Sequence, residues 1–166
     1  MKESQKLSFL FSMNQDLVKQ LIDEAIAENP SLFLISWKIS TGDAIEVLVD
    51  GDEGVSIEEI VRISRHIEHN LDREEFDFSL NVSSFGVGSH LELPRQYCKN
   101  IGRVLSILTI DGKEFEGEIK EADENSVLIT WEAREPKPIG KGKHTVQKEQ
   151  SFNLSEIKKA IVKITF

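Results

Sequence analysis

The spacing of apolar residues changes within residues 80–97, and no other feature restricts the possible folds of this chain as strongly. Before this stretch, apolar residues recur at helical spacing between short strand-like runs. After it, they alternate or cluster in strand-length runs that are separated by turn residues. Since 166 residues suffice for two small domains, we predict a first domain over residues 1–92 and a second over residues 93–166.

The two halves of the chain also differ in charge. Residues 1–93 carry 7 Lys and Arg against 18 Asp and Glu, a net charge of −11. Residues 94–166 carry 13 against 11, a net charge of +2. We therefore expect the first half to repel RNA and attract a basic protein, whereas the second half can approach phosphates.

The composition is that of a soluble globular protein, with 39% hydrophobic and 30% charged residues. No apolar run approaches the roughly 20 residues needed to cross a bilayer. Residues 7–13 form a short apolar patch without a cleavage site, which we interpret as a frayed or packed extension. The single Cys98 excludes an intramolecular disulfide and fits a reducing compartment. We expect a cytoplasmic protein without a membrane span.

The first half predicts an α+β domain with the order α-β-β-α-β. Its first helix follows Asn14, a good N-cap residue, and ends at an Asn-Pro pair. A second helix begins at Ser56, which forms a capping-box pattern with Glu59. The apolar face of this helix includes Ile57 and Val61. Strands are expected over residues 32–39, 44–50 and 76–83.

The second half predicts a small all-β domain. Turn residues at 111–113 and 123–125 separate runs of hairpin length, and residues 155–157 suggest a short helical turn. Short strands are expected over residues 103–110, 114–122, 126–133, 144–152 and 160–166. We predict that these strands close into a small barrel, because closure leaves no exposed sheet edge.

Two motifs contain metal-ligating residue types, but neither is complete. Asp50, Asp52 and Glu53 lie beside two glycines without the alternation and downstream carboxylate of a calcium loop, which favours a strand-to-helix turn. His66 and His69 lie three residues apart without a third ligand, which favours a solvated helix face. We therefore expect no metal site.

The sequence contains no recognisable nucleotide loop or catalytic motif. Gly86 and Gly88 lack the third glycine and the downstream acidic residue of a dinucleotide-binding loop. Cys98 and the serines at positions 83 and 84 belong to no known nucleophile signature. We expect neither a cofactor nor enzymatic activity.

A basic segment at residues 135–143 is rich in Pro, Gly and Lys. Positive charge held by such a segment can pair with phosphates without base specificity. A solubilising connection between two strands explains the same composition, so both interpretations stay open at this stage. The basic residues within or beside this segment are Arg134, Lys137, Lys141 and Lys143.

Several short motifs occur in a specific order and spacing. They are Val49-Asp50 with Gly54-Val55-Ser56, Ile63-Ser64-Arg65, residues 80–86, Leu93-Pro94-Arg95-Gln96-Tyr97 with Asn100-Ile101-Gly102, and Phe115-Glu116-Gly117. In these motifs the sequence resembles the bacterial ribosome maturation factor RimP family over nearly its whole length. The resemblance implies an α/β N-terminal domain, a C-terminal Sm-like or SH3-like β-barrel, and a non-enzymatic role in assembly of the small (30S) ribosomal subunit.

Our sequence-based hypothesis is a monomeric, cytoplasmic assembly factor that binds the immature small ribosomal subunit. Its acidic domain would face a basic ribosomal protein, and its barrel would lie near ribosomal RNA. The alternative is a standalone Sm-like RNA-binding regulatory protein that oligomerises through its barrel edges. The candidate RNA-binding residues are Arg134, Lys137, Lys141 and Lys143, and the candidate protein-binding residues are Asp50, Asp52, Glu53, Glu58 and Glu59.

Overall fold

The computed structural model describes residues 14–164. The apolar patch predicted at residues 7–13 lies outside the described residues. The chain divides between Phe85 and Gly86 into two compact units. No helix within residues 14–164 is long and apolar enough to cross a membrane.

The first unit contains helices and a three-stranded sheet. Its elements are α2 (Gln15–Ala27), β1 (Leu32–Ser40), β2 (Ala44–Gly51), α3 (Ile57–His69) and β3 (Ser79–Ser84). The sheet order is β1-β2-β3, in which β1 and β2 are antiparallel and β3 runs parallel to β2. A parallel neighbour requires a crossover connection, and α3 supplies it. The predicted order α-β-β-α-β is confirmed.

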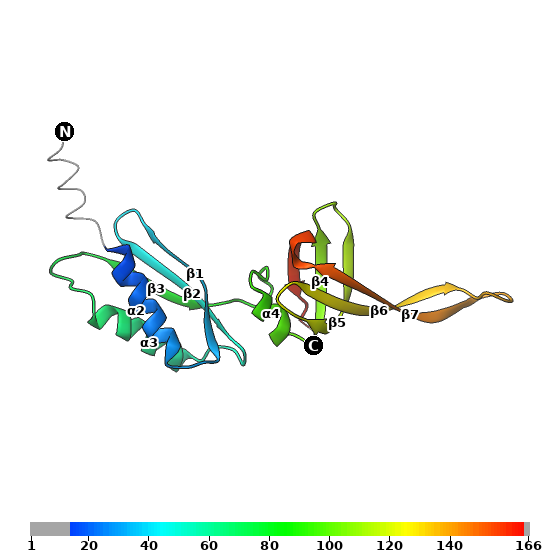
Figure 1. Cartoon of the computed structure of the whole chain (residues 1–166), viewed down its shortest axis with the longest axis horizontal. Coiled ribbons are helices and arrows are strands. Elements are labelled where there is room, and N and C mark those ends of the chain that lie inside the picture. Colours follow the sequence, from blue (N-terminus) through cyan, green and yellow to red (C-terminus); the bar gives the residue numbers. More distant parts are fainter. Residues whose placement is uncertain (1–13, 165–166) are drawn as a thin grey trace, which may run out of the picture. The chain divides into compact units, whose positions relative to one another are not determined.

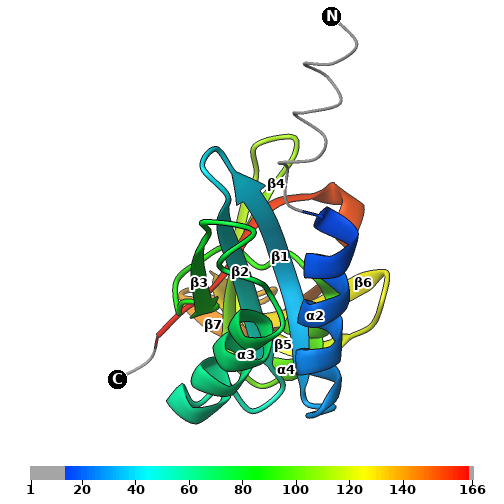
Figure 2. The same ribbon diagram turned by 90° about the vertical axis from the view of Figure 1, so that its left-hand side faces the viewer.

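Both helices pack on one face of this sheet (Figures 1 and 2). Alternate residues of a strand point to opposite faces, so Ile45, Val47 and Val49 of β2 all point toward the helices and are buried. Val18 and Ile22 of α2 are buried against them. The remaining buried apolar residues of this core are Leu21, Ala25, Ile26, Leu32, Ile63, Ile67, Leu71, Phe78 and Val82.

Side-chain caps fix where both helices begin, as the sequence predicts. The Asn14 Oδ1 atom accepts hydrogen bonds from the backbone N–H groups of Asp16, at 3.0 Å, and Leu17, at 3.2 Å. The Ser56 Oγ atom accepts from the backbone N–H of Glu59 at 3.2 Å. Each bond satisfies a backbone donor that the first turn of a helix otherwise leaves without a partner.

We expect the Ser56→Ala substitution to lower the free energy of unfolding of the first unit by about 1 kcal/mol, because it removes this cap. Urea denaturation followed by the fluorescence of Trp37, in a Trp131→Phe background, measures the change in the first unit. Ser56→Asp is the matched control, since Asp caps helices as well as Ser does. An equal loss of stability in both variants would contradict the assignment of Ser56 as the cap.

The second unit contains a short helix and a five-stranded antiparallel sheet. Its elements are α4 (Pro94–Lys99), β4 (Val104–Thr109), β5 (Glu114–Ala122), β6 (Ser126–Pro136), β7 (Lys143–Asn153), the 3₁₀ turn η1 (Leu154–Glu156) and β8 (Ile157–Val162). The sheet order is β7-β6-β5-β4-β8. These pairings give an open row of strands with β7 and β8 at its ends, so closure into a barrel stays a prediction.

The core of the second unit lies on one face of this sheet. Phe152 and Leu105 are its central buried side chains, and Phe115 packs edge-on against Phe152 with 4.8 Å between the ring centroids. Gly117 lets β5 approach β6 closely, because a Cβ atom at this position would lie 2.6 Å from the carbonyl oxygen of Thr130. The other buried apolar residues of this core are Tyr97, Ile107, Ile119, Val127, Ile129, Ala160 and Val162.

The α4 helix is an element that the sequence reading missed. Its first residue is Pro94, whose fixed φ suits the first turn of a helix. The buried side chain of Gln96 accepts hydrogen bonds from the backbone N–H groups of Glu92, at 2.8 Å, and Leu93, at 3.1 Å. The sequence therefore contains a signal for the start of this helix, which is a Pro followed two residues later by a capping Gln. Burial also raises the pKa of Tyr97 in this helix to about 12.

This burial predicts a loss of stability at high pH. An unfolded tyrosine ionises near pH 10, whereas the folded state keeps the Tyr97 hydroxyl protonated to about pH 12. The buried, protonated Tyr97 therefore contributes its full share to the free energy of unfolding below about pH 10. This contribution declines by about 2–3 kcal/mol as the pH rises to about 12. Urea denaturation at about pH 9 and about pH 12 should show this decline in the wild-type chain. In Tyr97→Phe the decline should be smaller by that amount, and an identical decline in both would contradict the prediction.

Candidate nucleic-acid interface

The β6 and β7 strands extend beyond the rest of their sheet as a two-stranded arm (Figure 1). Their pairing runs from Ser126 opposite Asn153 to Pro136 opposite Lys143. β5 pairs with β6 only as far as Thr130, so the part of β6 beyond this residue pairs with β7 alone. The sequence predicted that one strand ends at residue 133 and the next begins at residue 144. The observed strands reach Pro136 and Lys143, so the loop between them is shorter than predicted.

The four candidate RNA-binding residues lie at the distal part of this arm. We call Arg134, Lys137, Lys141 and Lys143 the arm cations. Arg134 pairs with Thr145 across the strands, and its guanidinium donates to the Thr145 hydroxyl and to the Lys143 carbonyl oxygen, both at 3.4 Å. Alternate residues share a face of a ribbon, so Arg134 and Lys143 present their charges on the same face.

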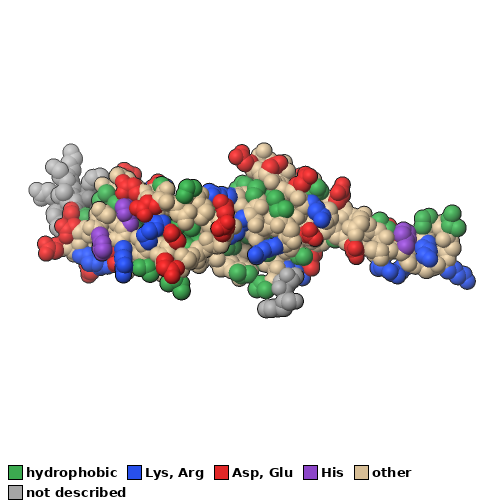
Figure 3. Space-filling view, turned by 90° about the horizontal axis from the view of Figure 1, so that it is seen from below, with side chains coloured by type: hydrophobic (Ala, Val, Ile, Leu, Met, Phe, Trp, Pro, Cys, Tyr) green, Lys and Arg blue, Asp and Glu red, His purple; other side chains and the backbone are tan. Residues whose placement is uncertain are grey.

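The loop between the strands holds the other two arm cations. The backbone N–H of Lys137 donates to the carbonyl oxygen of Gly142 at 3.1 Å, which closes the loop. Gly140 and Gly142 have φ values of +90° and +98°, a conformation that glycine adopts without steric cost. Figure 3 shows Lys and Arg side chains together with hydrophobic side chains at the end of the arm.

The arm cations differ from the neighbouring Lys148 in their pairing. Lys148 forms an ion pair with Glu135 at 2.5 Å, on the opposite face of the ribbon from Arg134. Its hydrogen bond and charge hold the pKa of Glu135 below the usual value. Within the described part of the chain, the three arm lysines form no ion pair. The arm therefore ends in positive charge that is open to solvent and available to an anionic partner.

The five candidate protein-binding residues lie around the turn that joins β2 to α3. Asp50 is only 5% exposed, and its Oδ1 atom accepts from the backbone N–H of Gly51 at 2.8 Å. Glu59 forms an ion pair with Arg62 at 2.5 Å. Asp52, Glu53 and Glu58 are exposed. The negative charge that faces solvent is therefore concentrated on these last three residues.

The surface of α3 is less uniformly acidic than the sequence indicates. Two residues of the predicted apolar face of α3 lie at the surface, because Ile57 is 80% and Val61 38% exposed. With Arg62 and Arg65 they line a shallow depression of about 380 Å³. Arg62 reaches across to α2, where it donates to the carbonyl oxygen of Ala25 and pairs with Glu28, both at 2.7 Å. This contact links α3 to the end of α2.

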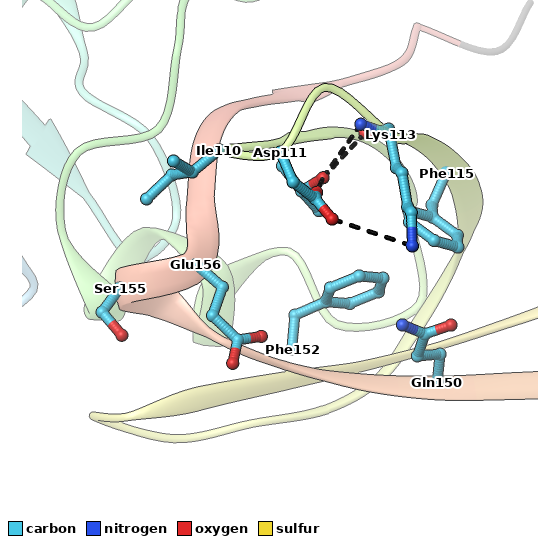
Figure 4. A pocket seen from close by; sticks show the side chains of 9 residues that line it. Ile110, Asp111, Lys113, Phe115, Gln150, Phe152, Ser155 and Glu156 are labelled. Carbon is cyan, nitrogen blue, oxygen red and sulfur yellow. Dashed lines mark hydrogen bonds and ion pairs between the residues drawn. The ribbon is translucent and has the colours of Figure 1, made fainter.

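The second unit also contains a pocket of about 570 Å³ (Figure 4). Phe115 and Phe152 form its aromatic wall, and Ile110, Asp111 and Lys113 line its rim. Lys113 lies 3.7 Å from the Asp111 carboxylate, and the hydroxyl of Thr109 donates to the same carboxylate. The hydrogen bond from Thr109 is the main reason that the pKa of Asp111 lies below its usual value. Ser155 and Glu156 also line it, and no histidine or cysteine is among its described lining residues.

One of the two histidines of the incomplete metal motif takes part in the contact between the helices. His66 lies on α3, and its Nε2 atom is 3.1 Å from a carboxylate oxygen of Glu24 on α2. The pair therefore links the two helices at the surface. Within residues 14–164, no group of three or more His, Cys, Asp and Glu side chains is arranged to hold a metal ion.

Comparisons with known proteins identify the family. The family model for the RimP N-terminal domain matches residues 21–88. A protein of Christiangramia forsetii named ribosome maturation factor RimP is 52% identical over 93% of this chain and 100% of its own length. The proteins of that name from Flavobacterium psychrophilum and Porphyromonas gingivalis are 44% and 34% identical, over 92% and 78% of this chain and 98% and 85% of their own lengths. The chain belongs to the RimP family of ribosome maturation factors.

Proposed function

We propose that this protein acts in ribosome maturation by binding an immature small ribosomal subunit, without catalysing a reaction itself. The single observation that carries the proposal is the arm of β6 and β7, which ends in cations that have no carboxylate partner among residues 14–164. Because phosphates supply most of the binding energy for proteins that recognise nucleic acid through charge, such an arm suits ribosomal RNA. We assign the arm cations to contacts with RNA phosphates.

The acidic first unit faces a basic ribosomal protein in this proposal. Asp52, Glu53 and Glu58 supply the exposed negative charge. Asp50 accepts a hydrogen bond from the backbone of the turn at Gly51, and Glu59 forms an ion pair with Arg62. The neighbouring apolar pair on α3, Ile57 and Val61, adds surface that a protein partner can cover. Charge attraction steers the encounter, and the apolar contact adds affinity.

The mechanism follows from differential binding. A factor that binds a partly folded RNA–protein intermediate more tightly than the mature subunit stabilises that intermediate. The same difference in affinity releases the factor when the subunit matures. No covalent step is needed in this mechanism. We infer that the protein works as a monomer in the cytoplasm.

The two edges of the sheet in the second unit are relevant to the alternative function, in which the protein oligomerises through sheet edges. β7 and β8 are the end strands of the sheet, and exposed edges can pair with another copy. However, the backbone N–H of Leu91 donates to the carbonyl oxygen of Ala160 at 2.8 Å, so the segment before α4 covers part of the β8 edge. Light scattering of the pure protein should give the mass of a monomer. A hexamer or a larger ring would favour the alternative.

Co-sedimentation tests the proposed function. The purified full chain is mixed with immature small subunits, mature small subunits or free 16S ribosomal RNA at near-physiological salt. We expect the largest bound fraction with immature subunits and a smaller one with mature subunits. Equal binding to mature and immature subunits, or none to either, would contradict a role in maturation.

A further inference from the structure

The end of the arm carries an apolar side chain as well as the cations. Ile139 lies in the loop between β6 and β7 and is 90% exposed. Among the exposed large apolar residues of the described chain, it has the highest exposed fraction. A single exposed apolar residue is common on protein surfaces. At this site, however, it lies between Lys137 and Lys141 at the distal end of a projecting ribbon.

Ile139 lies in a loop that a hydrogen bond closes. Pro138 precedes it, and the proline ring fixes the φ angle at that position. The hydrogen bond between Lys137 and Gly142 closes the loop on either side of it. The loop therefore presents an apolar side chain at a closed turn.

The charge around the tip selects the kind of partner. A basic ribosomal protein would be repelled by the arm cations, whereas RNA supplies phosphates on both sides of any base step. The deep major groove of an A-form helix is too narrow for side chains to read. An apolar tip flanked by cations therefore fits RNA where bases are unstacked, such as a bulge or an open junction.

We propose that Ile139 inserts as a wedge beside an unstacked base of RNA, while the arm cations hold the flanking phosphates. This inference rests on the RNA contact of the proposed function and adds a preference for distorted RNA. Proteins that bend or open duplexes insert apolar side chains between bases in the same manner, and they offset the cost of unstacking with charge contacts. Unpaired sites lower that cost, because their bases are already partly unstacked.

The test compares two RNA hairpins that share one stem sequence. One carries a short bulge with 2-aminopurine beside it, and the other has a continuous stem with 2-aminopurine at the same position. The full chain, Ile139→Ser and Ile110→Ser are titrated against both RNAs over a range of salt concentrations. Ile110 is the matched control, because it is an isoleucine of the same unit that is 67% exposed and lies away from the arm.

We expect Ile139→Ser to bind the bulged RNA about tenfold more weakly than the wild-type chain, which is the loss expected when one isoleucine is no longer buried. The salt dependence of binding, the affinity for the continuous stem and the behaviour of Ile110→Ser should be unchanged. The rise in 2-aminopurine fluorescence that wild type causes at the bulge should be lost in Ile139→Ser. Since Ile139 is exposed, the substitution should leave the fold intact, and circular dichroism checks this.

Two results would overturn the wedge. In the first, Ile139→Ser binds both RNAs as the wild-type chain does, although replacing the arm cations weakens binding; the phosphate contact then holds and the wedge fails. In the second, Ile139→Ser keeps its RNA affinity but no longer sediments with immature subunits, which assigns the tip to a protein. If replacing the arm cations also leaves RNA binding unchanged, the RNA contact of the proposed function fails together with the wedge.

Discussion

Replacement of the four arm cations by Ala is expected to weaken RNA binding by about 100-fold to 1,000-fold at about 0.1 M salt. Each cation that neutralises a phosphate releases a counterion, so four contacts should lower the slope of log affinity against log salt by about 3–4. Filter binding or fluorescence anisotropy with a fragment of 16S ribosomal RNA, repeated over a range of salt concentrations, measures both quantities. The effect should shrink as the salt concentration rises.

A matched control distinguishes the effect of the arm cations from the effect of a lower net positive charge. Replacing Arg103, Lys120, Lys158 and Lys159 by Ala also removes one Arg and three Lys, all exposed and all in the second unit. Both variants carry the same formal charge, so non-specific attraction to RNA falls equally in the two. We expect the control to keep most of the wild-type affinity and salt slope. A control that loses as much affinity as the arm variant would mean that overall charge, and not the arm, binds RNA.

The Phe152→Ala substitution should cost the second unit about 3–5 kcal/mol of unfolding free energy. The Phe152 side chain is 2% exposed and packs edge-on against Phe115. It also forms part of the wall of the pocket beside Asp111, so the space that it leaves joins an existing opening. The surrounding strands are held by their backbone pairing and can close over this space only in part.

The two tryptophans make this prediction measurable in one unit at a time. Trp131 lies on β6, with its ring centroid 6.1 Å from that of Phe115, whereas Trp37 lies on β1 of the first unit. In a Trp37→Phe background, urea denaturation followed by tryptophan fluorescence reports on the second unit alone. Ile139→Ala is the control for a simple loss of apolar atoms, and it should change the unfolding free energy by less than about 0.5 kcal/mol. A similarly small effect of Phe152→Ala would contradict the assignment of Phe152 to the core.

The order of the elements in the first unit could be predicted from the sequence because local chemistry determines it. The caps at Asn14 and Ser56 could be predicted from the residue types, and the observed hydrogen bonds explain why the helices begin there. The face that α3 buries was predicted less well. Ile57 is the first residue of this helix and is 80% exposed, while Arg62 contacts Ala25 and Glu28 at the end of α2. That contact spans two helices, so no local pattern in the sequence reveals it.

In the second unit, the strands with alternating apolar residues were predicted and the arm was not. Between Arg134 and Lys143, polar residues, prolines and glycines replace the alternation, yet Pro136 still pairs with Lys143 at the end of the ladder. The pairing of β6 with β7 continues because each strand supplies backbone partners to the other. The closure of the barrel depends on non-local pairing between edge strands, and the sequence supports it only as a prediction.

The candidate interface was identified from composition, while its geometry required the structure. Pro, Gly and Lys in one segment indicated solvent-exposed charge, but a simple connecting loop has the same composition. Pairing in space distinguishes Lys148, which is bound to Glu135, from the arm lysines. The exposure of Ile139 also became evident only when the loop was seen to end a two-stranded ribbon.

Site-specific photocrosslinking tests most directly the claim that the two units contact chemically different parts of an immature subunit. Benzoylphenylalanine is introduced in place of Lys141 in one variant and of Glu58 in the other, and each is irradiated in complex with immature small subunits. We predict that position 141 crosslinks to ribosomal RNA and position 58 to a basic ribosomal protein. Crosslinks from position 141 to protein alone, or from position 58 to RNA alone, would contradict the account.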